Sequence, residues 1–144
     1  MKIIIMLIGI AALASGCATS PVKVSQSQRV SGNRLLSGYS ALAQPSPAKA
    51  RVIVIRDAGM LAVAAPARLS VDGAPVARFW AGERVEFYLP GGDHIFAVQS
   101  DAQLQIVRSA LIENSFSFKP GRTYYFRISI TESSFFIQPS TQLQ

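Results

Sequence analysis

Cysteine and histidine are almost absent from this chain of 144 residues, which contains one of each. A lone cysteine excludes an internal disulfide, and a lone histidine excludes a metal site built from several imidazoles. Long hydrophobic runs are missing too. The longest, Ile3–Leu13, is only about half as long as the roughly 20 residues that a membrane-spanning helix needs. The sequence therefore favours a domain that is stabilised by its hydrophobic core alone.

The short hydrophobic run has the position and flanks of a bacterial lipoprotein signal. Lys2 precedes it, and three small residues separate it from Cys17. We predict a signal peptide over residues 1–16 and cleavage before Cys17, which then carries a diacylglycerol on sulfur and a fatty acid such as palmitate on nitrogen. Several acyl chains, at about 0.8 kcal/mol per buried methylene, anchor a protein firmly in the bilayer. The alternative is an ordinary signal or a short uncleaved helix, in which the cysteine has no role.

The residue after the cysteine and the charge balance predict location and partners. By the sorting rule of enteric lipoproteins, Ala18 in place of aspartate favours the outer membrane, on its periplasmic face. Loss of Lys2 with the signal leaves 13 basic against 8 acidic residues, a net charge of +5. Besides the bilayer that holds Cys17, we expect peptidoglycan, lipopolysaccharide or an envelope protein as partner, and no nucleic acid. The alternative is that dispersed arginines keep a β protein soluble and protect its edges.

Composition divides the mature chain once, near residue 50. Residues 17–50 are rich in Ser, Gln, Pro, Ala and Gly and poor in periodic apolar residues, which predicts a lipidated N-terminus followed by a flexible linker. Within it, residues 34–36 and 39–42 are more apolar and either dock on the domain as a short helix or strand or remain part of the linker. Residues 51–140 form the predicted domain.

Short strands separated by turn signals follow from residue 51 onward. Residues 51–56 are apolar on both faces, as in a central strand. Residues 83–89 alternate, and the apolar set is expected to face the core. Residues 57–66 are expected to be a connection, and residues 103–112 fit a strand or a short helix, of which we favour the strand. The fold class is therefore all-β, a single antiparallel β-sandwich of about seven to nine strands.

Three turn motifs occur in a fixed order: VDGAPV over Val71–Val76, LPGGDH over Leu89–His94 and KPGRTYY over Lys119–Tyr125. Together they resemble a family of uncharacterised bacterial lipoproteins with a PEGA-like β-sandwich domain. The resemblance covers residues 51–130 and implies a β-sandwich in the cell envelope. It implies no activity, because the family is defined by fold and location.

The residues available for catalysis argue against an enzyme. His94 follows a turn, so we expect its ring to hydrogen-bond the backbone there, and no Gly-x-Ser-x-Gly elbow supplies a nucleophile. Glu83 and Glu86, three residues apart on a predicted strand, face opposite ways and do not form a glycosidase pair. We therefore predict no enzyme, no cofactor and no metal.

Binding is the more plausible role. On the predicted strand 123–130, Tyr124 shares the inward face with Phe126, which leaves Tyr125 and Arg127 exposed as a platform for a sugar or an anionic group. Trp80, beside a turn, is the second candidate. The alternative for all three candidates is ordinary core or edge packing. The sequence thus predicts a non-catalytic outer-membrane lipoprotein that binds an envelope glycan or protein; the alternative is a structural or assembly accessory of an envelope-spanning machine, such as a secretion or conjugation system.

Overall fold

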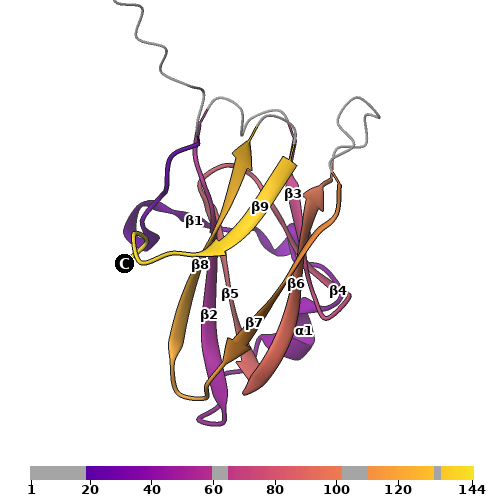
Figure 1. The fold of residues 1–144 in the computed structure, drawn as a ribbon, viewed down its shortest axis with the longest axis vertical. Helices are drawn as coiled ribbons and strands as arrows, with labels where there is room; N and C mark the ends of the chain where they lie inside the picture. The colour runs from indigo at the N-terminus through magenta and orange to yellow at the C-terminus, as the bar shows by residue number, and fades with distance from the viewer. Residues whose placement is uncertain (1–18, 60–64, 102–109, 132–133) are drawn as a thin grey trace, which may run out of the picture.

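The computed structural model of the chain describes residues 19–59, 65–101, 110–131 and 134–144. Within these ranges it consists mainly of β-strands, with one short α-helix and two short 3-10 helices near the N-terminus (Figure 1). The elements in chain order are η1 (Val24–Gln26), β1 (Gln28–Arg29), η2 (Gly32–Arg34), α1 (Tyr39–Leu42), β2 (Lys49–Arg56), β3 (Ala67–Val71), β4 (Ala74–Phe79), β5 (Glu83–Pro90), β6 (Gly92–Ser100), β7 (Ile112–Phe118), β8 (Thr123–Thr131) and β9 (Ser134–Pro139).

The strands form two sheets that face each other. One has five strands in the order β1-β5-β2-β8-β9, and the other has four in the order β4-β3-β6-β7. Most neighbouring strands run antiparallel, so the predicted all-β sandwich is confirmed. Two pairs are parallel, β1 with β5 and β2 with β8. Parallel neighbours need a long connection, and between β2 and β8 the chain passes through β3 to β7.

The alternation of β5 places its apolar side chains in the core. Val85, Phe87 and Leu89 are at most 4% exposed, while the residues between them are partly exposed on the other face. This is the period of two that a strand with one buried face requires. From Val52 onward β2 is buried on both faces, as expected for a central strand, because Ile53 and Ile55 pack against residues outside the sandwich.

Glycine and aspartate make two of the tight turns possible. Asp72 and Gly73 join β3 to β4 with φ angles of 50° and 79°. Both lie in the left-handed region, which a two-residue hairpin turn of type I′ needs and which Asp-Gly adopts at low cost. Gly121, with φ 74°, has the same freedom in the turn before β8. These two of the three predicted turn motifs therefore lie at the strand ends where the sequence places them.

Phenylalanine rings from both sheets form the centre of the core. The Phe96 ring of β6 has its centroid 5.2 Å from that of Phe126 on β8 and 6.0 Å from that of Phe87 on β5. Phe116 and Phe118 of β7 lie 5.5 Å from the same ring. Aromatic pairs at such distances contribute about 0.5–1.5 kcal/mol each beyond their buried area, so these rings tie the two sheets together.

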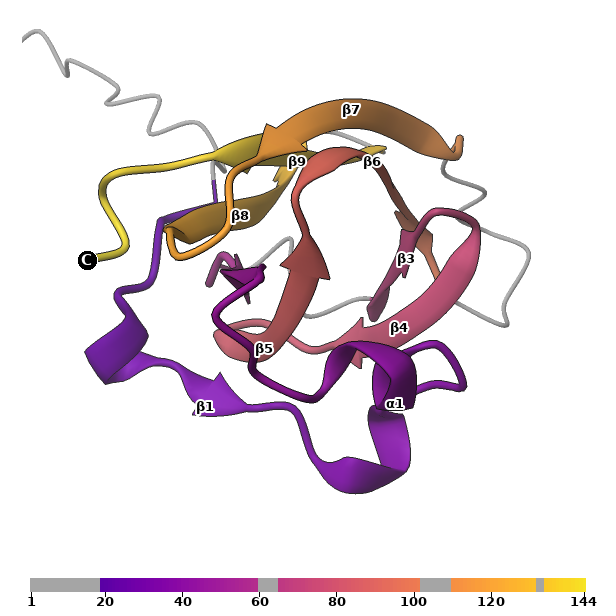
Figure 2. The ribbon, with the colours of Figure 1, turned by 90° about the horizontal axis from the view of Figure 1, so that it is seen from below.

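The segment expected to be a flexible linker is instead packed against the sandwich. Between residues 19 and 50, Val30 is only 7% exposed and belongs to the main core, and β1 pairs with β5. Leu35 forms a backbone bridge with Ala77 of β4. Figure 2 shows this segment running from β1 to α1 beside β5 and β4. Of the two alternatives for residues 34–36 and 39–42, docking on the domain is therefore correct. Single apolar residues are enough for this docking, and no periodic apolar pattern is needed.

Several expectations fall on residues outside the described ranges. These are the signal over residues 1–16 together with Cys17, the strand expected over most of 103–112, and part of the connection 57–66. Within the described ranges, no helix has the length and apolar character needed to cross a membrane.

Candidate functional site

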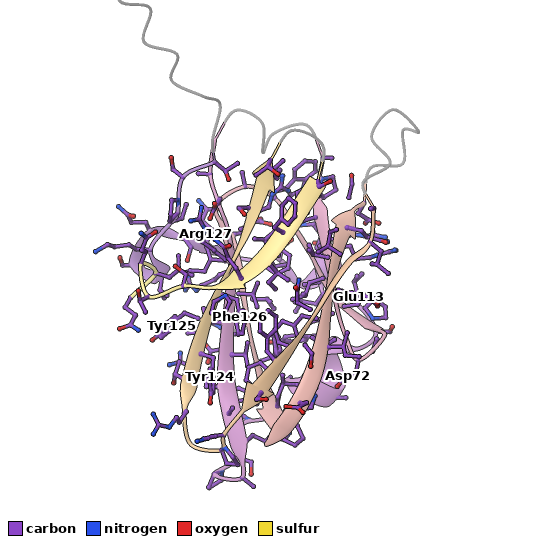
Figure 3. All side chains as sticks on the ribbon, in the orientation of Figure 1. Asp72, Glu113, Tyr124, Tyr125, Phe126 and Arg127 are labelled. Carbon is purple, nitrogen blue, oxygen red and sulfur yellow. The ribbon has the colours of Figure 1, made fainter. Side chains whose placement is uncertain are left out.

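The strand phase predicted for β8 is correct, but its outer face is not free. Phe126, Ile128 and Ile130 are at most 8% exposed and face the core. Tyr125 and Arg127 point to the other side of the sheet, as Figure 3 shows along β8. Both are only partly exposed there, because the chain's own termini cover this face.

Arg127 is engaged in an ion pair with a buried aspartate. Its guanidinium donates hydrogen bonds to both carboxylate oxygens of Asp57, one of them at 3.1 Å to Oδ1. The side chains of Arg127 and Asp57 are 16% and 1% exposed. The Thr19 hydroxyl donates a further hydrogen bond of 3.0 Å to Asp57. The prediction that Arg127 is an exposed binding residue is therefore wrong: the arginine balances a buried charge.

Tyr125 belongs to a second, smaller hydrophobic cluster. It packs with Ile53 and Ile55 of β2, with Leu143, and with Val22 and Val24. The backbone N–H of Val24 donates to the carbonyl oxygen of Leu143 at 2.9 Å, so the two terminal segments also hold each other. Tyr125 is thus a packing residue, which was the alternative considered for it.

Trp80 is the predicted candidate that remains exposed. It follows β4 and is 43% exposed. Its backbone N–H donates to Oε2 of Glu83 at 2.8 Å, and its carbonyl oxygen accepts from the N–H of the same residue at 3.2 Å. These bonds fix the tight connection between the sheets and leave the indole accessible.

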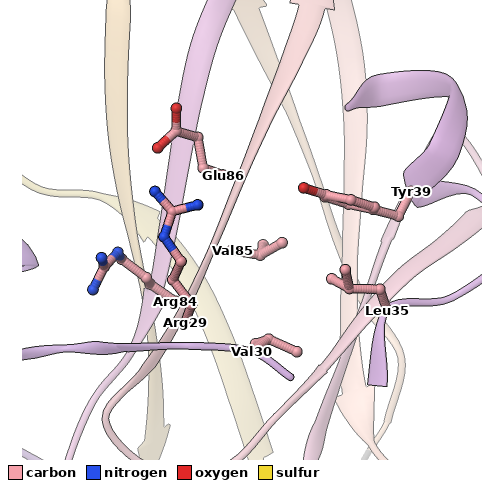
Figure 4. Close-up of a pocket in the computed structure, with 7 residues that line it drawn as sticks. All are labelled: Arg29, Val30, Leu35, Tyr39, Arg84, Val85 and Glu86. Carbon is pink, nitrogen blue, oxygen red and sulfur yellow. The ribbon is translucent and has the colours of Figure 1, made fainter. Parts of the chain in front are cut away.

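A hollow that was not predicted lies between β5 and the N-terminal segment (Figure 4). Its volume is about 110 Å³, and a neighbouring hollow of about 130 Å³ shares three of its lining residues. Those three are Arg29 of β1, Tyr39 of α1 and Glu86 of β5. The first hollow is also lined by Val30, Leu35, Arg84 and Val85, and the second by Ala43, Pro45 and Tyr88.

The hollow combines an apolar floor with a polar rim. Val30 and Val85 belong to the core, and Leu35 packs against it. In Figure 4 the Tyr39 hydroxyl points across the opening, while Arg29 and Glu86 lie together on the other side. Such a pattern suits a ligand with one apolar face and several polar groups. Each hollow is smaller than a typical pocket for a small molecule, which has about 300–1,000 Å³.

Glu86 is the best satisfied polar group of the rim. Arg51 donates two hydrogen bonds of 2.8 Å to its carboxylate, and the Tyr88 hydroxyl donates another of 2.8 Å. The bonds from Arg51 hold the pKa of Glu86 below its usual range, although burial acts in the opposite direction. The bond to Glu86 raises the pKa of the Tyr88 hydroxyl. Glu86 is therefore a charged carboxylate whose charge Arg51 balances.

Arg29 is the unsatisfied cation of the rim. It is exposed, and it makes no hydrogen bond or ion pair with any residue that the structure describes. The neighbouring Arg84, in contrast, donates to the Ser27 hydroxyl at 2.9 Å and to the carbonyl oxygen of Val24 at 3.2 Å. The charge of Arg29 helps to lower the pKa of the nearby Glu86, but the direct bonds to that carboxylate come from Arg51 and Tyr88. The guanidinium of Arg29 is therefore the group of the hollow best suited to bind an anionic ligand.

No known family model matches this chain. A search of curated proteins gives no match either. The resemblance to PEGA-like lipoproteins therefore stays a prediction, and the site has to be judged on its own geometry.

His94 is fixed by a turn rather than placed in a cleft. Its Nε2 lies 3.0 Å from the carbonyl oxygen of Pro90, which is the expected contact with the backbone, and its Nδ1 lies 2.6 Å from Oδ2 of Asp72. Burial of Asp72 raises the pKa of its carboxyl, but hydrogen bonds from the ring and from the N–H of Ile95 outweigh this and lower it. The described residues contain no group of three or more His, Cys, Asp or Glu able to hold a metal ion.

The hollow was not predictable from the sequence pattern, because two of the residues that line both hollows lie in the segment expected to be a linker. Arg29 and Tyr39 are isolated side chains there, with no periodic pattern around them. The signal that was available is the local one: Tyr39 belongs to the short apolar stretch at residues 39–42. The sequence predicts a cross-strand ion pair of Glu86 with Arg78 or Arg84, and this is wrong in the partner, because Glu86 pairs with Arg51 of β2.

Proposed function

We propose that this protein is a non-catalytic lipoprotein of the bacterial outer membrane, held by acylated Cys17, whose β-sandwich binds an anionic glycan of the cell envelope in the hollow beside β5. The proposal keeps the location and the role predicted from the sequence but moves the binding site. Tyr125 and Arg127 are replaced by Arg29 and Tyr39, because the former pair is occupied within the domain.

The single observation that carries this proposal is the exposed guanidinium of Arg29, which lies across the hollow from Tyr39 and makes no direct hydrogen bond to a described residue, above an apolar floor. A sugar ring presents an apolar face to an aromatic side chain and hydroxyl groups at its edge. A carboxylate or phosphate on the same glycan accepts hydrogen bonds from a guanidinium. Glu86 supplies an acceptor for sugar hydroxyls at the rim.

The size of the hollow supports recognition of part of a polymer. At about 110 Å³ it holds an edge or a single substituent rather than a whole substrate. The sole histidine is engaged at both ring nitrogens in a turn at Pro90. Both features favour a binding role over catalysis.

A titration of the mature chain with purified muropeptides and with lipopolysaccharide tests the proposal. The protein is made without the signal and with Cys17→Ser, and calorimetry is run at low and moderate salt. Wild type should bind at least one ligand, and binding should weaken with salt because exposed charges are screened beyond about 10 Å at 0.1 M. Arg29→Ala should reduce affinity by between about tenfold and about 150-fold, as expected for loss of a charge-assisted hydrogen bond of about 1.5–3 kcal/mol.

A matched control separates the site from general charge. Arg122 is exposed too, but lies in the turn before β8 and lines neither hollow. Arg122→Ala removes the same charge and should leave affinity unchanged. Equal losses in the two variants, or no binding by wild type at low salt, would reject the hollow as the site.

The accessory role is the second candidate, and strand β7 favours it. β7 is the outermost strand of its sheet, contains one charged residue, Glu113, and has no proline. No backbone hydrogen bond from a described residue outside β6 reaches it. The opposite edge, β4, contains Pro75 and is covered by residues 35–38. An open edge of this kind accepts a strand from a partner protein.

Photo-crosslinking in intact cells tests this second role. A crosslinking residue at Ser115, exposed on β7, should give a discrete protein adduct if a partner strand binds there. The same residue at Ser25, exposed in η1, serves as the control. Equal patterns from both positions would remove β7 as a partner site.

A further inference from the structure

The first described residues are fixed to the sandwich rather than free. The N–H of Ser20 donates to the carbonyl oxygen of Ala58 at 2.8 Å, and the N–H of Ala58 donates back to Ser20 at 3.0 Å. The Thr19 hydroxyl donates to buried Asp57 and accepts from the N–H of Ile130 at 3.3 Å. Four hydrogen bonds therefore hold the chain at the upper end of the molecule in Figure 1.

This attachment leaves a very short free chain between the sandwich and the proposed lipid anchor. Only Ala18 separates Cys17 from Thr19. Two residues of fully extended chain span about 7 Å. A sandwich held by acylated Cys17 therefore has this end, which we call the anchored end, within about 7 Å of the anchor.

Exposed apolar side chains gather at the anchored end. The described residues include four large exposed hydrophobic side chains. Three of them lie at or near the ends of strands, and the pairing of these strands puts those ends at the anchored end. They are Trp80, Leu111 and Phe136. Trp80 follows the end of β4, Leu111 precedes β7, and Phe136 is the third residue of β9. The fourth, Ile95, lies beside the turn at Asp72, at the opposite end.

Hydrogen bonds connect the residues on either side of Trp80 to the anchored end. The Arg56 guanidinium donates to the carbonyl oxygen of Phe79 at 2.6 Å, and the N–H of Gly82 donates to the carbonyl oxygen of Arg56 at 3.0 Å. Arg56 precedes Asp57, which binds Thr19. Trp80 is thus at the same end of the molecule as the fixed N-terminal chain, and its indole is a side chain suited to the boundary between lipid and water.

A group of three charged side chains near this end, Arg68, Arg78 and Asp101, suits a lipid surface as well. Arg68 and Arg78 both pair with Asp101, which leaves one positive charge in excess. Their side chains are 36% and 43% exposed. Basic residues near a membrane surface are attracted by anionic headgroups.

We infer that the anchored end is a membrane-contacting surface, on which Trp80, Leu111 and Phe136 rest in the headgroup region of the bilayer that holds Cys17. The inference rests on the proposed acylation of Cys17. It adds an orientation: the hollow beside β5 then stands at a fixed height at the side of the domain, and the turn at Asp72 points away from the bilayer.

Fluorescence of the single tryptophan tests this orientation in the acylated mature protein. The protein is reconstituted in phospholipid vesicles that contain phosphatidylglycerol, with and without lipids brominated near the headgroup. Flotation and the mass of the N-terminal peptide are measured first. Trp80 emission should shift to the blue on reconstitution and should lose intensity in the brominated vesicles.

Two matched proteins control for simple proximity to vesicles. In Trp80→Phe/Ile95→Trp the only indole sits at the opposite end, and we expect no quenching by brominated lipid. In the second, about 20 Gly and Ser residues inserted after Ala18 give the domain a tether of roughly 25 Å, and quenching of Trp80 should fall although the protein still floats.

The outcomes separate this inference from the proposed function. A protein that carries no lipid and does not float contradicts the proposed anchoring, and the orientation falls with it. A protein that floats, but whose Trp80 is quenched no more than the indole at position 95, keeps its anchor and contradicts the orientation. Quenching of Trp80 alone, lost on insertion of the tether, supports it.

Discussion

Replacing Arg127 with alanine should strongly destabilise the domain. The substitution removes the guanidinium that pairs with Asp57, a carboxylate only 1% exposed. Among the described residues, the Thr19 hydroxyl then remains as a hydrogen-bond donor to that carboxylate. Removing one partner of a buried ion pair leaves an uncompensated charge and costs about 3–5 kcal/mol. That is a large part of the 5–15 kcal/mol by which domains are typically stable.

Two further variants show whether charge is the cause. Arg51→Ala breaks the ion pair between Arg51 and Glu86, in which the Arg51 side chain is 45% exposed. Because water screens such a pair, the substitution should lower the unfolding free energy by only about 0.2–1 kcal/mol. Adding Asp57→Asn to Arg127→Ala removes the uncompensated charge and should restore a large part of the lost stability, because the remaining amide is neutral.

The assay is urea unfolding of the mature chain, followed by the emission of Trp80. A loss of less than about 0.5 kcal/mol in Arg127→Ala, the usual effect of an exposed substitution, would refute the buried ion pair. Equal losses in Arg127→Ala and in the variant that also carries Asp57→Asn would show that packing rather than charge is responsible.

Three further predictions concern the anchor, the core and pH. Cys17→Ser should abolish palmitate incorporation and normal processing, and unchanged labelling would contradict the lipid anchor. Phe87→Ala should cost about 3–5 kcal/mol of unfolding free energy because the side chain is fully buried, whereas Tyr88→Ala, on the half-exposed face, should cost less. Hydrogen bonds hold the pKa of Asp72 below its unfolded value, so this carboxylate contributes stability above about pH 4 that is lost as the pH falls further. Asparagine tolerates the same backbone conformation, so the Asp72→Asn variant should lose less stability than wild type between about pH 5 and pH 3, as measured by urea unfolding. An identical loss in the two proteins would contradict a role for the contact with His94.

The faces of the strands were predictable from the sequence because alternation depends only on local geometry. Val85, Phe87 and Leu89 are buried as their spacing indicates, and the Asp72-Gly73 turn ends β3 where expected. Each of these features needs nothing beyond a strand with one buried face or a turn with positive φ angles.

Contacts between distant segments were not predictable from periodicity. The burial of Arg127 depends on Asp57 and Thr19, which are 70 and 108 residues away in the chain. A correct strand phase placed Arg127 on the outer face, but it did not show that the chain's own termini cover that face. In the same way, Val30 and Leu35 dock singly, so composition alone made their segment look like a linker.

The most direct test of the central claim is a titration of the isotope-labelled mature chain with muropeptides, followed by amide chemical shifts. The account predicts saturable shifts that cluster at Arg29, Tyr39 and Glu86 and that disappear in Arg29→Ala, which should retain the wild-type spectrum elsewhere. Shifts that gather instead around Tyr125 or Trp80, or a spectrum that does not change at low salt, would contradict binding of a wall glycan in the hollow beside β5.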